Sequence, residues 1–126
     1  MSRSAVVMDR FQDGIALRLE AHPMGEDWNI SISGGDRPHI GAAALATPYD
    51  KPRGGRSACA SVLALPTHKE DVLARQAALL LAKRTGRTVL VACGIHVDGL
   101  SPEGIAAVVA LAEEAVETLA HRLEGL

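Results

Sequence analysis

Three of the five histidines stand where a predicted strand meets a turn or a helix. His39 lies in GGDRPHIGA, His68 in PTHKED and His96 in GIHVDG. In folds that pack helices on sheets, ligand-binding groups gather at the ends of strands and the starts of helices. We therefore take these three segments as the candidate ligand site.

The segment GIHVDG follows TVLVAC, a predicted buried strand, and precedes a predicted helix. His96 and Asp98 are two residues apart, which puts their side chains on the same side of an extended chain. Asp98 would then orient the imidazole or accept a hydrogen bond from a ligand hydroxyl. The same pattern is equally typical of an aspartate that starts a turn before a helix, so both interpretations stay open.

The chemistry predicted for the three segments is anion binding. A helix start has unpaired backbone N–H groups and a partial positive charge, which favour a phosphate. His68 and Lys69, in the first turn of a predicted helix, strengthen that preference, and Arg37 supplies a forked donor for phosphate oxygens. The GGD at 34–36 frees the backbone for a positive φ and for close approach to a ligand. Each of these signals alone is also typical of a surface histidine or of a plain hairpin turn. The prediction therefore depends on finding all of them together.

Four successive strands are predicted before these helices. Residues 14–22 and 28–33 alternate apolar and polar side chains, and residues 39–47 and 56–65 form apolar stretches. Prolines and glycines among charges predict an exposed, mobile loop at 48–56. Strands in succession with short connections predict an antiparallel meander.

Two helices and one more strand follow. Thr67 with Glu70 predicts a capping box for a first helix that ends at Gly86. The strand RTVLVAC follows, and a second helix opens at Ser101 with Pro102 in its first position. The order ββββαβα predicts an α+β fold, with a mixed, mostly antiparallel sheet and both helices packed on one face. This order would place the two helix starts near one another.

Composition narrows the class of protein. The 126 residues predict one domain, 1–126, and 13 scattered Lys and Arg against 15 Asp and Glu exclude a nucleic-acid footprint. The start lacks the apolar segment of a signal peptide, and no apolar run reaches about 18 residues, so we expect a cytoplasmic protein that does not enter a membrane. Cys59 and Cys93 are predicted to be buried free thiols.

The segments SGGDRPHIGA, LPTHKEDVLARQAALLLAK and VACGIHVDGLSPEGI resemble, in this order and spacing, a family of small prenylated-flavin chaperones. These are the LpdD-type D subunits that accompany UbiD-type aromatic-acid decarboxylases. The resemblance covers roughly residues 30–110. It implies a non-catalytic protein that binds prenylated FMN, or FMN, and protects it or delivers it to the decarboxylase. It also implies a homodimer or higher homo-oligomer, and some likeness to proteasome-assembly chaperones.

The resemblance also implies which positions contact or shape the cofactor site. With Arg37 added for its chemistry, they are Gly34, Gly35, Asp36, Arg37, His39, His68, Lys69, Asp71, His96 and Asp98. Only 2% of the residues are aromatic, so a flavin ring would need Trp28 or a partner subunit as its platform.

Two other functions stay open. In the first, His39, His68 and His96 with nearby carboxylates hold a divalent metal that activates water for a hydrolase, although these histidines lack HxxxH spacing. In the second, the chain is a ligand-free assembly scaffold whose alanine-rich last helix is the docking surface. A bound chromophore, a stoichiometric metal, or neither would distinguish the three.

Overall fold

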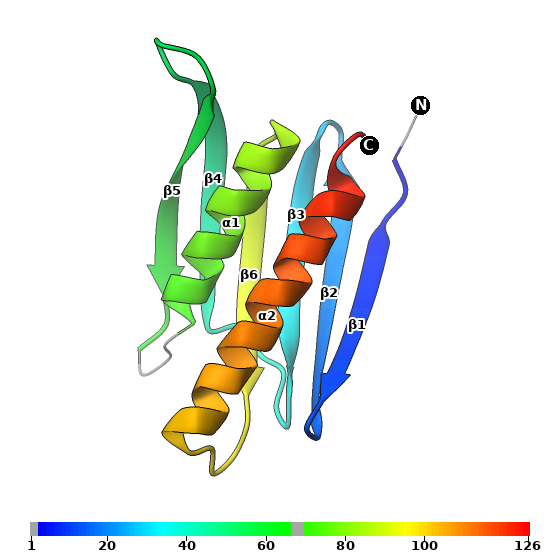
Figure 1. Cartoon of the computed structure of the whole chain (residues 1–126), viewed down its shortest axis with the longest axis vertical. Coiled ribbons are helices and arrows are strands. Elements are labelled where there is room, and N and C mark those ends of the chain that lie inside the picture. Colours follow the sequence, from blue (N-terminus) through cyan, green and yellow to red (C-terminus); the bar gives the residue numbers. More distant parts are fainter. Residues whose placement is uncertain (1–2, 67–69) are drawn as a thin grey trace.

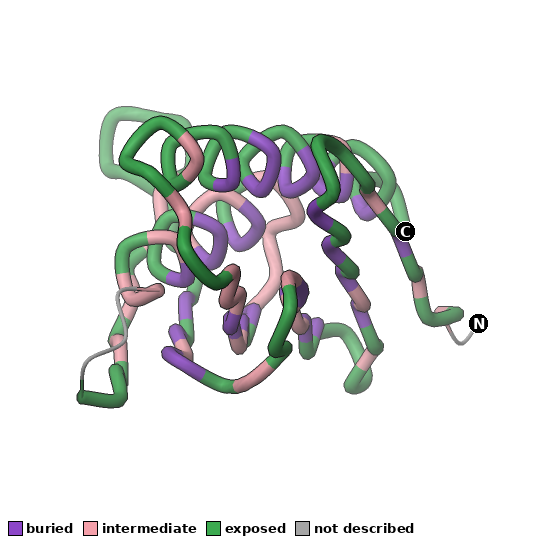
Figure 2. The backbone as a smooth tube through the Cα atoms, turned by 90° about the horizontal axis from the view of Figure 1, so that it is seen from below, coloured by how far each residue is buried: buried purple, intermediate pink, exposed green. Residues whose placement is uncertain are grey.

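The computed structural model describes residues 3–66 and 70–126 and contains six strands and two helices within them. The elements in chain order are β1 (Val6–Gln12), β2 (Ile15–Met24), β3 (Asp27–Gly35), β4 (Ala42–Asp50), β5 (Arg56–Ala64), α1 (Asp71–Thr85), β6 (Val89–His96) and α2 (Pro102–Leu123). The strands form one sheet in the order β1-β2-β3-β6-β4-β5 (Figure 1). Among the strand pairs of the described residues, only the β3–β6 pair is parallel. Both helices lie on the same face of the sheet (Figure 2), so the predicted α+β architecture is confirmed.

Strand β1 is absent from the sequence prediction. It is an edge strand with charged side chains, and its Asp9 forms a cross-strand ion pair with Arg18 of β2 at 2.9 Å. These charges hide the alternation that would otherwise identify a strand. Asp13 and Gly14 both have positive φ, 52° and 78°, as a tight two-residue hairpin requires, and this Asp-Gly pair is the signal that was available.

The predicted four-strand meander is wrong in one respect. β1, β2 and β3 form a meander and β4 and β5 a hairpin, but β6 inserts between β3 and β4. Residues 36–41, which we call the crossover loop, must therefore pass β6 to reach β4. The strand predicted at 39–47 begins only at Ala42 for this reason. It then runs through Asp50, which reduces the predicted loop at 48–56 to a short exposed turn at 51–55.

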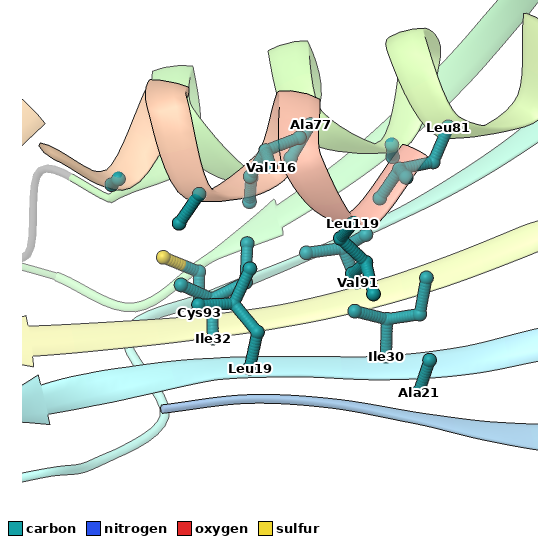
Figure 3. Packing of buried hydrophobic residues seen from close by; sticks show 14 of the residues in the cluster. Leu19, Ala21, Ile30, Ile32, Ala77, Leu81, Val91, Cys93, Val116 and Leu119 are labelled. Carbon is teal, nitrogen blue, oxygen red and sulfur yellow. The ribbon is translucent and has the colours of Figure 1, made fainter. Parts of the chain in front are cut away.

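The core lies between the helices and one face of the sheet (Figure 3). Leu19, Ile30, Ile32 and Val91 are completely buried there. The helices contribute small side chains, which let them approach the sheet closely. The buried helix alanines are Ala74, Ala77, Ala78, Ala82, Ala112, Ala115 and Ala120.

The two cysteines have different surroundings. Cys93 is 1% exposed, and burial, aided by the negative charge of Glu70, raises the pKa of its thiol to about 12. It therefore stays protonated and unreactive at neutral pH. Cys59 lies on the opposite face of the sheet and is exposed, so the prediction that both thiols are buried is wrong for Cys59.

The helix ends follow the predictions only in part. Ser101 caps α2, its Oγ accepting a hydrogen bond from the N–H of Gly104 at 3.1 Å, and Gly86 ends α1 with a φ of 70°. However, α1 begins at Asp71 with Glu70 as its N-cap residue, and no capping bond from the Glu70 side chain is found in the described structure. Thr67, the other half of the predicted capping box, lies outside the described residues. Among the helices described, none has the length and hydropathy needed to cross a membrane.

Candidate ligand-binding site

The crossover loop lies directly on β6, on the face of the sheet opposite the helices (Figure 2). Gly94 points to that face, because its neighbour Cys93 is buried toward the helices. A Cβ atom at Gly94 would collide with the carbonyl oxygen of His39. At the end of the loop, the N–H of Gly41 donates to the carbonyl oxygen of Cys93 at 2.9 Å. The absence of a side chain at position 94 is therefore what lets the loop cross.

The double glycine shapes the entry to this loop. Gly35 has a φ of 77°, a left-handed conformation that favours glycine, and a Cβ there would collide with the carbonyl oxygen of His96. The N–H groups of Asp36 and Arg37 both donate to that same oxygen, at 2.7 and 3.3 Å. A Cβ at Gly34 would meet the backbone of the neighbouring strand. The glycines thus fix the path that brings Asp36 and Arg37 to the end of β6.

Asp36, Arg37, His96 and Asp98 form a hydrogen-bonded group, which we call the Arg37 cluster. Arg37 Nη2 donates to Asp98 Oδ1 at 2.7 Å, and His96 Nε2 lies 2.8 Å from the same oxygen. Asp36 Oδ2 accepts from the backbone N–H of Asp98 at 3.0 Å. The hydrogen bond from Arg37, followed by that from His96, holds the pKa of Asp98 below its ordinary value of 3.8. Asp98 is therefore an ionised acceptor at neutral pH.

His39 connects the crossover loop to the start of α1. Its Nδ1 lies 3.0 Å from the carbonyl oxygen of Arg37, and because a carbonyl only accepts, Nδ1 carries a proton. Its Nε2 lies 3.0 Å from Glu70 Oε1. The rings of His39 and His96 meet edge-on, with centroids 6.4 Å apart. Loop, strand end and helix start are thus joined through side chains.

Glu70 is the polar residue of this site that the sequence analysis missed. Its carboxylate contacts His39 and lies beside Gly41, where a Cβ would collide with it. The sequence analysis assigned that carboxylate to the capping box of its own helix. The available signal was Gly41, a residue without a side chain immediately after a candidate histidine.

Two pockets flank His96. The apolar pocket, about 420 Å³, lies on the helix side, between the starts of α1 and α2 and the end of β6, with Glu70 and His96 among its lining residues. Its aliphatic lining includes Leu73, Ile95, Val97, Leu100, Ile105 and Val109. The polar pocket, about 320 Å³, is lined by Arg37, His39, Ile40 and His96. The expectation that the two helix starts lie near one another is confirmed, because both line the apolar pocket.

The predicted site residues divide into three groups. Those brought together at the end of β6 are Gly34, Gly35, Asp36, Arg37, His39, His96 and Asp98. His68 and Lys69 lie outside the described residues. Asp71 occupies the first turn of α1 and lines neither of the two pockets beside His96.

Trp28 is 2% exposed in the core, where the guanidinium of Arg3 stacks on it. It cannot offer its ring to a ligand, so its predicted use as a flavin platform is wrong.

A metal site is the alternative hypothesis for the three histidines. Across residues 3–66 and 70–126, no three His, Cys, Asp or Glu side chains converge in a way that could hold a metal ion. The hydrolase hypothesis also uses His68, so it stays a prediction.

Known proteins resemble this chain in fold, and a family model matches its sequence. A chain in a structure described as "Crystal Structure of a Novel Chaperone Complex for Yeast 20S Proteasome Assembly" superposes with a TM-score of 0.59, over 94% of this chain and 98% of that chain. The two are 14% identical, so the likeness shows the fold alone. A comparison with curated proteins gives no match. The family model for the prenylated flavin chaperone LpdD-like domain matches residues 11–124, and the chain therefore belongs to the LpdD-like family of prenylated flavin chaperones.

Proposed function

We propose that this chaperone binds prenylated FMN, or FMN, at the end of β6 and protects it or delivers it to a UbiD-type aromatic-acid decarboxylase. Membership of the family supports a chaperone or accessory role. The observation that carries the binding proposal is the position of the Arg37 cluster, since its His96 lines the polar and the apolar pocket alike.

The residues at this site match the three parts of an FMN molecule. The aliphatic pocket, about 420 Å³, is in the size range of small-ligand sites and suits a ring system. The carboxylates of Asp36 and Asp98 suit the hydroxyls of the ribityl chain, and the guanidinium of Arg37 suits the phosphate. Two carboxylates beside one arginine would repel a longer polyphosphate, so the charges favour a monophosphate.

Each group then has a role in binding. Arg37 would bind phosphate oxygens, while His96 and Asp98 would exchange hydrogen bonds with ligand hydroxyls. The contact between His39 and Glu70 would hold the crossover loop against α1. His68, Lys69 and Asp71 belong to the proposal on their chemical type alone.

No catalytic residue is required of this chain in the proposal. The prenylated flavin would supply the chemistry of decarboxylation once it is bound to the decarboxylase. The aliphatic walls of the apolar pocket would remove one side of the ring from water until transfer. The remaining proposed partner is a second copy of this chain, as the family resemblance implies.

The experiment compares His96→Ala with His121→Ala. His121 is exposed in the last turn of α2, where its Nε2 lies 3.9 Å from Glu117, so it serves as a control away from the site. His96→Ala should weaken prenylated FMN binding by about 1–3 kcal/mol, because polar ligand groups lose a partner. His121→Ala should bind like the wild type.

The measurement is fluorescence quenching on folded protein, preceded by co-expression with a prenylated-flavin synthase and mass spectrometry under native conditions. A flavin mass on the wild-type chain is the expected result. Equal flavin affinity in the two variants would make GIHVDG a connecting turn and would refute the proposed site.

A further inference from the structure

The apolar pocket is open at the start of α2, although it is built from large aliphatic side chains. Ile105 is 54% exposed and Val109 is 38% exposed, while Val116 and Leu119, further along the same helix, are 2% and 0% exposed. The helix thus packs on the sheet along its second half, whereas its first turns leave an apolar wall uncovered. Ile105 and Val109 are four residues apart and lie side by side on one face of the helix.

The other walls of the pocket are also aliphatic. Leu73 lines it from α1, and Ile95 lines it from the end of β6. The polar side chains of the lining are Glu70 and His96, which both belong to the hydrogen-bonding network of the site. A ligand held by the Arg37 cluster can therefore extend an apolar end into this pocket.

The chemistry of these walls distinguishes between two forms of the cofactor. Prenylated FMN carries hydrocarbon that FMN lacks, and that hydrocarbon makes no hydrogen bonds. Aliphatic side chains favour such carbons by removing them from water, whereas the hydrogen bonds of the Arg37 cluster would be the same for both flavins. We propose that the apolar pocket receives the prenyl-derived carbons and thereby selects prenylated FMN over FMN. This inference rests on the proposed function.

The test measures the affinities of the purified full-length protein for prenylated FMN and FMN in the absence of oxygen. Wild-type protein should prefer prenylated FMN by about tenfold or more, the usual value of extra apolar carbon in a matching pocket. Val109→Trp fills the pocket and Ile105→Asn makes its wall polar. Either change should bring the preference to about twofold or less, because the affinity for prenylated FMN falls more than the affinity for FMN.

The matched control is Ala110→Trp, because Ala110 follows Val109 but is exposed and does not line the pocket. It should keep the wild-type preference. Thermal melts followed by circular dichroism establish that each variant is folded. The partly exposed Ile105 makes Ile105→Asn the safer substitution if Val109→Trp does not fold.

Each remaining outcome is decisive. Wild-type protein that binds neither flavin would overturn the proposed function and this inference together. Equal wild-type affinity for both flavins, or a parallel loss of both in the variants, would overturn the selection while leaving flavin binding in place. Unchanged affinities combined with failure to activate the decarboxylase would assign the pocket to the partner enzyme and would also overturn the inference.

Discussion

Asp98 is the site residue whose ionisation depends most directly on a neighbour. Arg37 and His96 both hydrogen-bond to it and lower its pKa below 3.8, so the carboxylate stays ionised in mild acid. The stabilising contact is complete above the pKa of the unfolded chain, and it is lost as the pH falls through the lower pKa of the folded protein. The Arg37 cluster should therefore be intact at neutral pH and come apart only in strong acid.

Arg37→Ala should raise the pKa of Asp98 toward its ordinary value, because Arg37 makes the larger contribution. Carboxyl ¹³C NMR titration measures this shift. Asp9 of β1 is the internal control, since its pKa is lowered by Arg18 of β2 and should not change in the variant. A variant in which Asp98 titrates as in the wild type would show that Arg37 is not its main partner.

The polar part of the site could be predicted from the sequence, and the apolar part could not. His96 and Asp98 can be identified in the sequence by their residue types, their spacing and their position after a predicted strand. The apolar pocket combines Leu73, Ile95 and Ile105, which come from three separate elements and look like ordinary core residues in the sequence. That they line one pocket becomes visible only once the helix starts are placed in space.

At the scale of elements, the crossing of loop and strand depends on Gly94. Gly94→Ala should destabilise the protein by about 1–3 kcal/mol, because the new methyl group would overlap the His39 carbonyl and force the loop to lift. Urea denaturation measures the loss. The control is Ser33→Ala, the neighbour of Gly94 on β3, which adds no atom and should change stability by about 0.5 kcal/mol or less. Equal stability of the two variants would mean that the loop does not lie on β6.

Elements marked by local signals were predicted well. Ser101 and Pro102 fix the start of α2, and Gly86 fixes the end of α1, because each acts within one turn of its own helix. The order of the strands has no such local signal. The position of β6 between β3 and β4 depends on pairing partners far away in the chain, which periodicity does not report.

At the scale of the whole molecule, the sheet has one face that the helices leave open (Figure 2). Over β6, β4 and β5, successive outward positions carry uncharged side chains, and we call them the open-face patch. They are Leu90, Ala92, Ala43, Leu45, Thr47, Cys59, Ser61 and Leu63. An uncharged patch is complementary to itself, as a two-fold contact between copies requires. The three strands that carry the patch measure roughly 400 Å² from strand spacing and length, about half of the area that each partner buries in a standard interface, so the patch would form the centre of the contact.

The open-face patch is a better candidate for a self-association surface than the buried side of the alanine-rich last helix. Ala112, Ala115 and Ala120 of the alanine-rich last helix are completely buried against the core, so they are not available to a second copy. Leu63 and Leu45, by contrast, are 80% and 52% exposed.

Sedimentation at micromolar concentration should show a wild-type dimer and a monomeric double variant, Leu45→Glu with Leu63→Glu, because the added charges would face one another. Val72→Glu is the control, since Val72 is an exposed apolar residue of α1 on the other side of the molecule. A dimer that survives the double substitution would exclude this face, and a wild-type monomer would exclude self-association altogether.

The central place of β6 also governs when the site can exist during synthesis. Val91 pairs with Ile30 on one side and with Ala44 on the other, 61 and 47 residues earlier in the chain. The pairings within the β1–β3 meander and within the β4–β5 hairpin are local, but these two units stay unjoined until the strand that separates them emerges. Such distant pairings form slowly compared with local ones. Arg37 then meets Asp98 when β6 pairs with β3, so the cluster cannot be presented to a ligand before β6 has joined the sheet.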